Sequence, residues 1–537
     1  MSQPEQVRMQ PQQDRRLSSA RSLLGPLFAP LDFLLASGGD TRLAVDRTSG
    51  LNGYGCRPYP RPEAFTFASS TATSISQRAY AQAAAAREAL VAATIECKGA
   101  FEARIESMRA RLLPLLGLAG SGTQIVFSPS GTDAQLQALV LVRALLGGPI
   151  ASIAVAADET GSGTSFAIAG RHFNTSTALG HAVTKGEMLP GLDDAVARFD
   201  VFTRDENGHL RTGEAMDRAV IAAVAQAIGA GRKVLLQTMD RSKLWRRAPS
   251  QQCLSEIKAR WPSDVQVVVD ACQVRLSPER IRTYLSRGEM VLITGSKFFT
   301  GPPFSGALLV PAALSARLCG NVAIPRGLED YSNASDWPVC WQAIRTQLPD
   351  GYNVGQWLRW EAGLAEMDAY FAVPQNFRSN ALAQFAATAS RLIGDGDLEL
   401  LDEGPRDTSD AIDDLEFSTR TILPFTIRRN GAGLPREAVA GIYRALNCDI
   451  SDHLPPGASA QDRQMAAQLC HIGQPVAVRT ADGTETAALR ISAGARILSE
   501  SWCADAETAE RNLQGECAQV GLIVEKIGLL VRHQISV

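Results

Sequence analysis

Hydrophobic and polar positions follow two different periods along this chain. Residues 77–112 are rich in Ala, Glu, Arg and Leu, contain no Pro and have no Gly before Gly99, which predicts one or two long helices. Helix-like stretches such as DAQLQALVLVRALL then alternate with short β-branched runs, which read QIVF, IASIAVAA, KVLLQTM, VQVVV and MVLIT. This alternation predicts an α/β fold with a mostly parallel sheet and helices on both faces.

The pattern changes after about residue 375. An acidic, turn-rich stretch, DGDLELLDEGPRDTSDAIDDLE, leads into a predicted strand, FSTRTILPFTI, and a predicted helix, PREAVAGIYRAL. A second strand, TAALRIS, and a closing helix from about Asp505 follow. We therefore expect an N-terminal arm and extended segment over 1–75, a large domain over 76–374 and a small C-terminal α+β domain over 375–537.

Composition favours a globular protein that acts on a small molecule. Of 537 residues 45% are hydrophobic, and the net charge of −3 gives no electrostatic reason to expect nucleic acid or a membrane surface as partner. The first sixteen residues are polar and lack the apolar region of a secretory signal. Two prolines and Asp32 interrupt the apolar stretch LLGPLFAPLDFLLA, which predicts a docked amphipathic segment and no membrane span. We expect a cytoplasmic protein.

The ten cysteines are scattered, without a CxxC pair or a His/Cys cluster at metal-ligand spacing. This spacing argues against a disulfide framework and against a zinc site, so we expect no metal. Most of these thiols should be reduced and buried.

Candidate chemistry lies where the apolar runs end, because ligands of open α/β sheets bind at the carboxyl ends of the strands. The first such place is FSPSGTDAQ at 127–135, where Ser130, Gly131 and Thr132 join a strand to a helix. A Gly-containing turn before a helix suits a phosphate group. The same residues also fit a plain helix N-cap, and both interpretations stay open.

Asp270 ends the second informative run, VQVVVD. A carboxylate at the end of a buried strand is costly unless it meets a cation, such as a protonated pyridine ring. An ion pair with Arg275 is the alternative. Gln273 offers an amide that can hydrogen-bond a phenolic oxygen on the same ring.

Lys297 follows the run MVLIT, and two Phe residues come directly after it. Burial favours the uncharged form of an amine, which is the form that condenses with an aldehyde. A lysine that snorkels out of a loop is the alternative. The order of phosphate turn, ring-nitrogen acid and lysine is the one expected of a site that holds pyridoxal 5′-phosphate (PLP) as a Schiff base.

On the strength of these motifs, roughly residues 75–515 resemble the fold-type I PLP enzymes. Within these enzymes the chain resembles a divergent member of the aminotransferase class V group, which includes cysteine desulfurases, selenocysteine lyase and kynureninase. The resemblance implies a PLP-transferase (aminotransferase-like) fold and a homodimer. It implies that Arg490, in ALRISAGAR, binds the substrate α-carboxylate. The cofactor-binding residues that it implies are Ser130, Gly131, Thr132, Thr160, Asp270, Gln273, Thr294, Ser296 and Lys297.

The sequence departs from the class V pattern around the ring. Ser296 stands where the family usually has a His before the lysine. The family places a ring-stacking His in the segment that corresponds to ADETGSGTSF, which contains none. Glu159 or Thr160 is expected there instead, and His172 is interpreted as structural.

Cysteine desulfurases also carry a persulfide-forming Cys in a mobile loop before the substrate arginine. The corresponding loop here reads LCHIGQPV, and the family Cys would fall near Ile472. Cys470 is therefore a displaced candidate for a catalytic residue, with a buried free Cys as the alternative.

The Ser/Thr-rich end of residues 48–76 is a candidate lining for a substrate entrance, with turn and cap residues as the alternative. Taken together, we expect a PLP enzyme in which Lys297 and Asp270 act on an amino acid, in a lyase or sulfur-handling reaction that labilises the Cα–H bond. An aminotransferase or epimerase is one alternative. A non-catalytic binding module with this fold is another.

Overall fold

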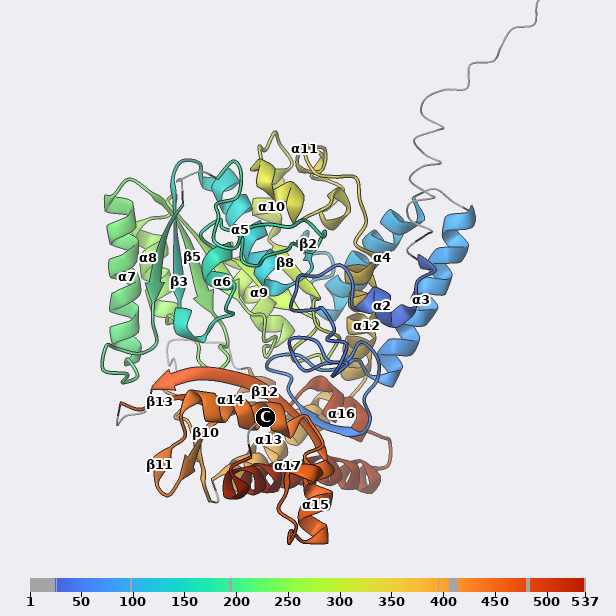
Figure 1. Ribbon diagram of the computed structural model, residues 1–537. Helices are drawn as coiled ribbons and strands as arrows, with labels where there is room; N and C mark the ends of the chain where they lie inside the picture. The colour runs from blue at the N-terminus through green and yellow to red at the C-terminus, as the bar shows by residue number, and fades with distance from the viewer. Residues whose placement is uncertain are drawn as a thin grey trace, which may run out of the picture.

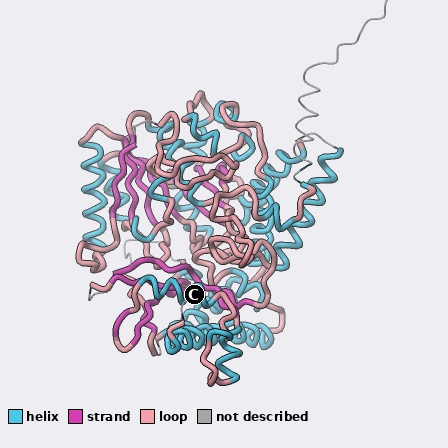
Figure 2. The backbone as a smooth tube through the Cα atoms, in the orientation of Figure 1, coloured by secondary structure: helices cyan, strands magenta, loops and turns pink. Residues whose placement is uncertain are grey.

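The computed structural model describes residues 25, 27–96, 99–192, 196–394, 396–404, 414–479 and 483–535. The described residues form two β-sheets with their helices, and the N-terminal segment runs between the sheets (Figure 1). Strands of the larger sheet lie between helices in the upper part of the tube view (Figure 2).

The larger sheet has the order β2-β8-β7-β6-β5-β3-β4. Its strands are β2 (Gln124–Ser128), β3 (Ile150–Val155), β4 (Val196–Val201), β5 (Lys233–Met239), β6 (Val265–Asp270), β7 (Met290–Thr294) and β8 (Gly306–Val310). Strand β8 runs antiparallel to both β2 and β7, and the pairs from β7 through to β4 are parallel. The carboxyl ends of β3, β5, β6 and β7 therefore meet at one edge of the sheet.

Helices cover both faces of this sheet, as the pleat of the strands requires. They are α5 (Gly131–Leu146), α6 (Thr164–Ala167), α7 (Gly213–Gly229), α8 (Gln251–Arg260), α9 (Pro278–Ser286), α10 (Ala312–Leu318) and α11 (Gln342–Arg345). Leu292 packs in the cluster that contains α5, whereas its neighbours Val291 and Ile293 pack on the opposite face in the cluster that contains α9. The predicted α/β fold, mostly parallel with helices on both faces, is confirmed.

The smaller sheet has the order β1-β12-β13-β10-β11, with β9 paired to β10. Its strands are β1 (Ala64–Phe67), β9 (Leu398–Leu400), β10 (Ile422–Arg429), β11 (Ala432–Gly433), β12 (Leu469–Arg479) and β13 (Glu485–Ser492). Helices α13 (Gln375–Ile393), α14 (Arg436–Leu446), α15 (Ala460–Ala467), α16 (Ala495–Ser501) and α17 (Ala506–His533) accompany it. The smaller C-terminal α+β part is thus present, and it also takes in β1 from the N-terminal segment.

The predicted helical region contains two helices, α3 (Gln77–Glu96) and α4 (Ala100–Leu115), which pack on α12 (Val354–Phe371). The predicted docked segment contains the short helix α2 (Leu31–Leu35), which also contacts α12. Residues 405–413 of the acidic stretch and most of the predicted N-terminal arm lie outside the described residues.

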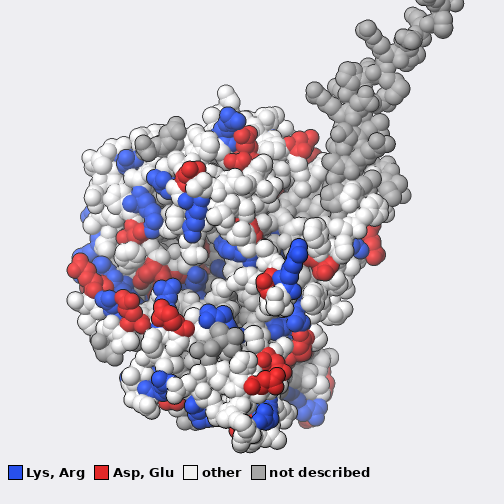
Figure 3. Space-filling model, in the orientation of Figure 1, with Lys and Arg blue, Asp and Glu red and all other residues white. Residues whose placement is uncertain are grey.

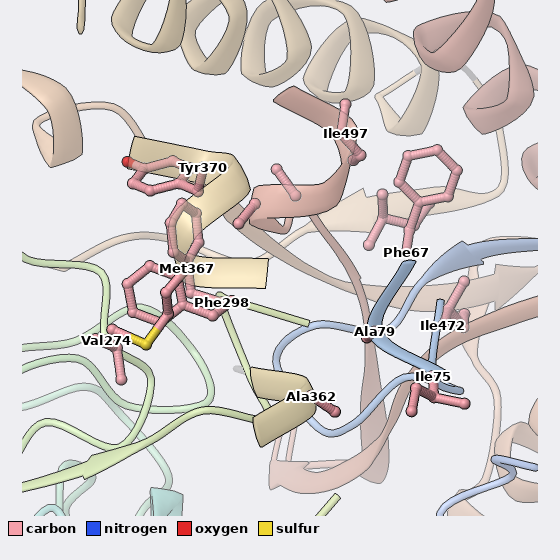
Figure 4. Close-up of a cluster of buried hydrophobic side chains, with 14 of the residues drawn as sticks. Phe67, Ile75, Ala79, Val274, Phe298, Ala362, Met367, Tyr370, Ile472 and Ile497 are labelled. Carbon is pink, nitrogen blue, oxygen red and sulfur yellow. The ribbon is translucent and has the colours of Figure 1, made fainter. Parts of the chain in front are cut away.

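One apolar cluster joins the parts of the chain (Figure 4). Phe67 and Ile75 enter it from the N-terminal segment, and Ile472 enters it from β12. Phe298, the residue after Lys297, meets Tyr370 of α12 with ring centroids 5.2 Å apart. The lysine turn is therefore anchored in the core that connects the two sheets.

The surface shows no strong segregation of charge on the visible face, where Lys and Arg are interspersed with Asp and Glu (Figure 3). Among the described helices, none combines the length and the hydrophobicity that crossing a membrane requires.

Candidate active site

A cavity of about 330 Å³ lies at the carboxyl edge of the parallel strands, where the N-terminal segment and the small sheet close over it. The residues around it come from both sheets and from the N-terminal segment, although they are far apart in the sequence. The sequence-predicted residues that line it are Ser130, Gly131, Thr132, Asp270, Thr294, Ser296, Lys297 and Arg490.

Lys297 extends from the turn that follows β7. Its neighbours Phe298 and Phe299 are buried, and Phe298 also meets Phe417 with ring centroids 5.1 Å apart. Among the described residues, no hydrogen bond or ion pair engages the Lys297 amine, which lines the cavity from a half-buried position. A fixed backbone thus presents an amine that is available to a ligand.

Asp270 is buried at the end of β6 and accepts hydrogen bonds only from uncharged groups. Gln135 Nε2 donates to Oδ2 over 3.0 Å, and the backbone N–H of Cys272 donates to Oδ1 over 3.1 Å. The alternative ion pair with Arg275 does not form, because that guanidinium binds Gln273, Ser69, Thr421 and the carbonyl of Ala493. In the part of the chain that the structure describes, no side-chain cation pairs with this carboxylate, and a cationic ligand group would balance its charge.

The turn before α5 combines a helix cap with a cation. Ser130 Oγ accepts hydrogen bonds from the backbone N–H groups of Thr132 and Asp133, so Ser130 is the N-cap. Gly131 is required by close packing, since a Cβ there would lie 2.9 Å from Cys272 Sγ. The Arg42 guanidinium donates to Thr132 Oγ1 over 3.3 Å. A helix start with an arginine over it suits a phosphate.

Arg42 comes from the N-terminal segment. Besides the hydrogen bond to Thr132, an ion pair and a ring contact hold its guanidinium in place. It pairs with Asp40 at 2.6 Å, and its guanidinium lies over the Phe304 ring at 5.1 Å from the centroid. The neighbouring Asp133 is buried, and burial together with the charge of Asp40 raises its pKa to about 7.

Arg490 lies on β13 with 1% of its surface exposed. Its NH2 group donates to Thr71 Oγ1 at 2.8 Å and to the carbonyl of Gln474 at 2.5 Å, while Nε and NH1 have no partner among the described residues. Burial lowers its pKa to about 10. Gly473, opposite Arg490 in the pairing register, leaves it room, because a Cβ there would lie 2.8 Å from Arg490 Nε. Two unpartnered donors of a buried guanidinium suit a carboxylate.

Two predicted cofactor residues do not line the cavity. Thr160 is turned toward Lys243, whose amine donates to the Thr160 carbonyl over 2.8 Å. The Gln273 amide donates to the Ser70 carbonyl, and its oxygen accepts from Arg275 over 2.8 Å. The ring-stacking position is also not taken by Glu159, which is buried in an ion pair with Arg246. Gly161, Ser162 and Thr164 line the cavity in that region.

The prediction that LCHIGQPV forms a loop is wrong. This segment lies within strand β12, which pairs with β1 on one side and with β13 on the other. Cys470 is fully buried in the core and does not line the cavity. Burial raises the pKa of its thiol to about 11. Ile472, at the family's cysteine position, is also in the apolar cluster (Figure 4). His172, which donates to or accepts from Tyr331 over 2.7 Å, lies outside the cavity lining.

Several lining residues were missed from the sequence: Arg42, Tyr54, Gln135, Lys243 and Phe304. The position of Lys243, just after the run KVLLQTM, is the same strand-end signal that pointed to Asp270. Ser70 and Thr71, from the Ser/Thr-rich end of the N-terminal segment, line the cavity as well. Local sequence gave no signal for Arg42.

The sequence matches no protein family model and no curated protein. Among solved structures, the chain is similar to the cysteine desulfurase CsdA of Escherichia coli, with 12% identity over 85% of this chain and 94% of that one (TM-score 0.45). It is similar to the TDC of Oryza sativa with PLP and tryptamine, with 15% identity over 97% of this chain and 89% of that one (TM-score 0.46). A third similar structure is the cystine C–S lyase C-DES with its product cysteine persulfide, with 13% identity over 85% and 98% (TM-score 0.44).

Proposed function

We propose that the protein is a PLP-dependent enzyme that acts on an amino acid. The observation that carries the proposal is the buried carboxylate of Asp270, which has amide donors and no side-chain cation among the described residues, in the same cavity as the Lys297 amine. A carboxylate in this setting gains most from a ligand whose buried end is cationic, and a pyridinium nitrogen is such a group.

The cavity residues fit the other parts of the cofactor as well. The turn at Ser130–Thr132, together with Arg42, would hold the phosphate. Lys297 would carry the cofactor aldehyde, and Asp270 would face the ring nitrogen. Bound PLP supplies an electron-withdrawing ring that stabilises negative charge at the amino acid Cα.

Residues of the protein would bind the substrate and move the proton. Arg490 would bind the substrate α-carboxylate through its guanidinium, which lines the cavity. The Lys297 amine, which has no protein partner among the described residues, would take the proton from Cα.

Among the reactions on this machinery, we favour a lyase reaction in which loss of the Cα proton precedes loss of a side-chain substituent. A sulfur relay through Cys470 is not part of the proposal, since that thiol lies in the core with a raised pKa. An aminotransferase remains the second candidate and would leave a keto acid and pyridoxamine phosphate.

The test is cofactor retention followed by product analysis. Protein mixed with PLP and freed of excess cofactor should keep a visible absorbance band, and Lys297→Ala should lose the band while a surface variant, Lys185→Ala, keeps it. Incubation with amino acids should then change the band and yield a keto acid without pyridoxamine phosphate. Wild-type protein that retains no PLP would overturn the proposal.

A further inference from the structure

The cavity contains more positive than negative side chains. Among the described residues that line it, four are cationic and one is acidic: Arg42, Lys243, Lys297 and Arg490 against Asp270. Under the proposed function Arg42 meets the phosphate, Lys297 carries the cofactor and Arg490 binds the α-carboxylate. The proposed function assigns no ligand group to the remaining cation, Lys243.

Lys243 reaches the cavity from the segment after β5, the strand next to β6 with Asp270. Its amine donates one hydrogen bond, to the Thr160 carbonyl over 2.8 Å. An ammonium has three donors, so a single neutral acceptor leaves two of them for a ligand.

Asp240, three residues before Lys243, and Glu159, next to Thr160, are paired with other cations. Asp240 forms an ion pair with Arg247 at 3.0 Å and accepts a hydrogen bond from Tyr284. Glu159 forms an ion pair with Arg246 at 2.8 Å. No ion pair of Lys243 is formed within the described part of the chain, so its charge has no partner of its own.

The protein surroundings of Lys243 oppose a positive charge on its amine. Burial and the positive charges of Arg490, Lys297 and Arg42 lower its pKa to about 7, while Asp270 acts in the opposite direction. Bringing an anion next to this amine would remove that penalty, which makes anion binding favourable at this position.

We propose that Lys243 binds a second carboxylate, carried by the side chain of the substrate, so that the cavity selects amino acids whose side chain carries a carboxylate. The inference rests on the proposed function and names its substrate class. Arg490 holds the α-carboxylate, and Lys243, which reaches the cavity from the large sheet, holds the distal one. An amide or an apolar side chain at that place would leave the Lys243 charge unbalanced, which is the source of the discrimination.

Unreactive dicarboxylates test the inference apart from catalysis. Calorimetry with PLP-loaded wild-type protein should give a dissociation constant for succinate or glutarate at least about tenfold lower than for propionate or butyrate, as expected for one charge-assisted hydrogen bond. Lys243→Met should remove this preference and leave the affinity for propionate unchanged. Lys243→Arg should keep most of it, and Lys185→Met, at an exposed lysine, should keep all of it.

A second readout separates binding of the distal group from a structural role of the Lys243–Thr160 hydrogen bond. Lys243→Met should raise the concentration of L-aspartate that half-saturates the change in PLP absorbance about tenfold or more and leave that of L-asparagine unchanged, whereas a purely structural lysine would affect both alike. Equal affinities for succinate and propionate in PLP-loaded wild-type protein, or a preference that survives in Lys243→Met, would overturn this inference alone. Failure of the wild-type protein to retain PLP would instead overturn the proposed function, and this inference with it.

Discussion

Gln135 Nε2 donates a hydrogen bond to Asp270 Oδ2 over 3.0 Å, although the two residues are 135 positions apart in the chain. Gln237, on β5, directs its amide to the same oxygen at 3.4 Å. Neutral donors orient the carboxylate without neutralising it, so its negative charge stays available to a ligand. We therefore expect the proposed activity to depend on the negative charge of Asp270 more than on the shape of its side chain.

Asp270→Asn tests that statement, because it preserves size and removes charge. We expect folding and PLP retention to persist and turnover of amino acids to fall by about 100-fold or more, the scale for losing one partner of a buried ion pair. Activity and the thermal midpoint measure the two effects separately. The matched control is Asp205→Asn in an exposed turn, which should change neither. Full activity in Asp270→Asn would show that the charge of this carboxylate is not needed for turnover.

Gly473→Ala should displace the guanidinium of Arg490. The new Cβ would lie 2.7 Å from Ser70 Oγ and 2.8 Å from Arg490 Nε, so one of these groups must move. We expect about a tenfold or larger rise in the dissociation constant for propionate, measured by calorimetry. Gly515→Ala, in α17 with nothing within 4 Å of the added Cβ, is the control and should stabilise the protein by up to about 1 kcal/mol. Unchanged binding in Gly473→Ala would argue against the role of Arg490.

Cys470→Ala should leave the spectral response to amino acids unchanged, because the thiol lies in the core outside the cavity lining. Deleting one buried sulfur should lower the free energy of unfolding by about 1–2 kcal/mol. Cys517→Ala, in another part of the same core cluster, gives the matched loss of stability. A folded Cys470→Ala protein that no longer responds to amino acids would restore the sulfur-relay hypothesis.

Asp133→Asn should change how stability depends on pH. Since burial raises the pKa of Asp133 from 3.8 to about 7, the folded protein keeps a proton there that the unfolded chain releases between these values. The contribution of this group is full below the lower pKa and is lost as pH rises through the higher one, at about 1 kcal/mol per pH unit within that window. Urea unfolding from pH 4 to 8 should therefore show a steeper decline for the wild type than for Asp133→Asn. Parallel curves would contradict the raised pKa.

The strand ends were the part of the site that the sequence could predict. An apolar run of five or six residues marks a buried strand, and a polar residue within a few positions of its end marks the sheet edge, which is how Asp270 and Lys297 were found. Strand β4 was missed because it lies at the edge of the sheet and carries Arg198 and Asp200, which break the apolar pattern.

Other features depend on contacts that no local pattern encodes. Arg42 reaches the turn before α5 only because the N-terminal segment folds back across the cavity, a contact between residues 90 positions apart. The segment around Cys470 was predicted as a loop on the strength of a family pattern. Pairing with β1 from the distant N-terminal segment makes it an inner strand of the small sheet.

The most direct test of the central claim is to locate the lysine that binds the cofactor. The cavity contains two lysines, Lys243 and Lys297, so the presence of bound PLP alone does not distinguish them. PLP-loaded protein should be reduced with borohydride, digested and mapped by mass spectrometry. The account predicts the phosphopyridoxyl group on the peptide that contains Lys297, and none on that peptide in Lys297→Ala; a label on Lys243, or no labelled lysine in the wild type, would contradict it.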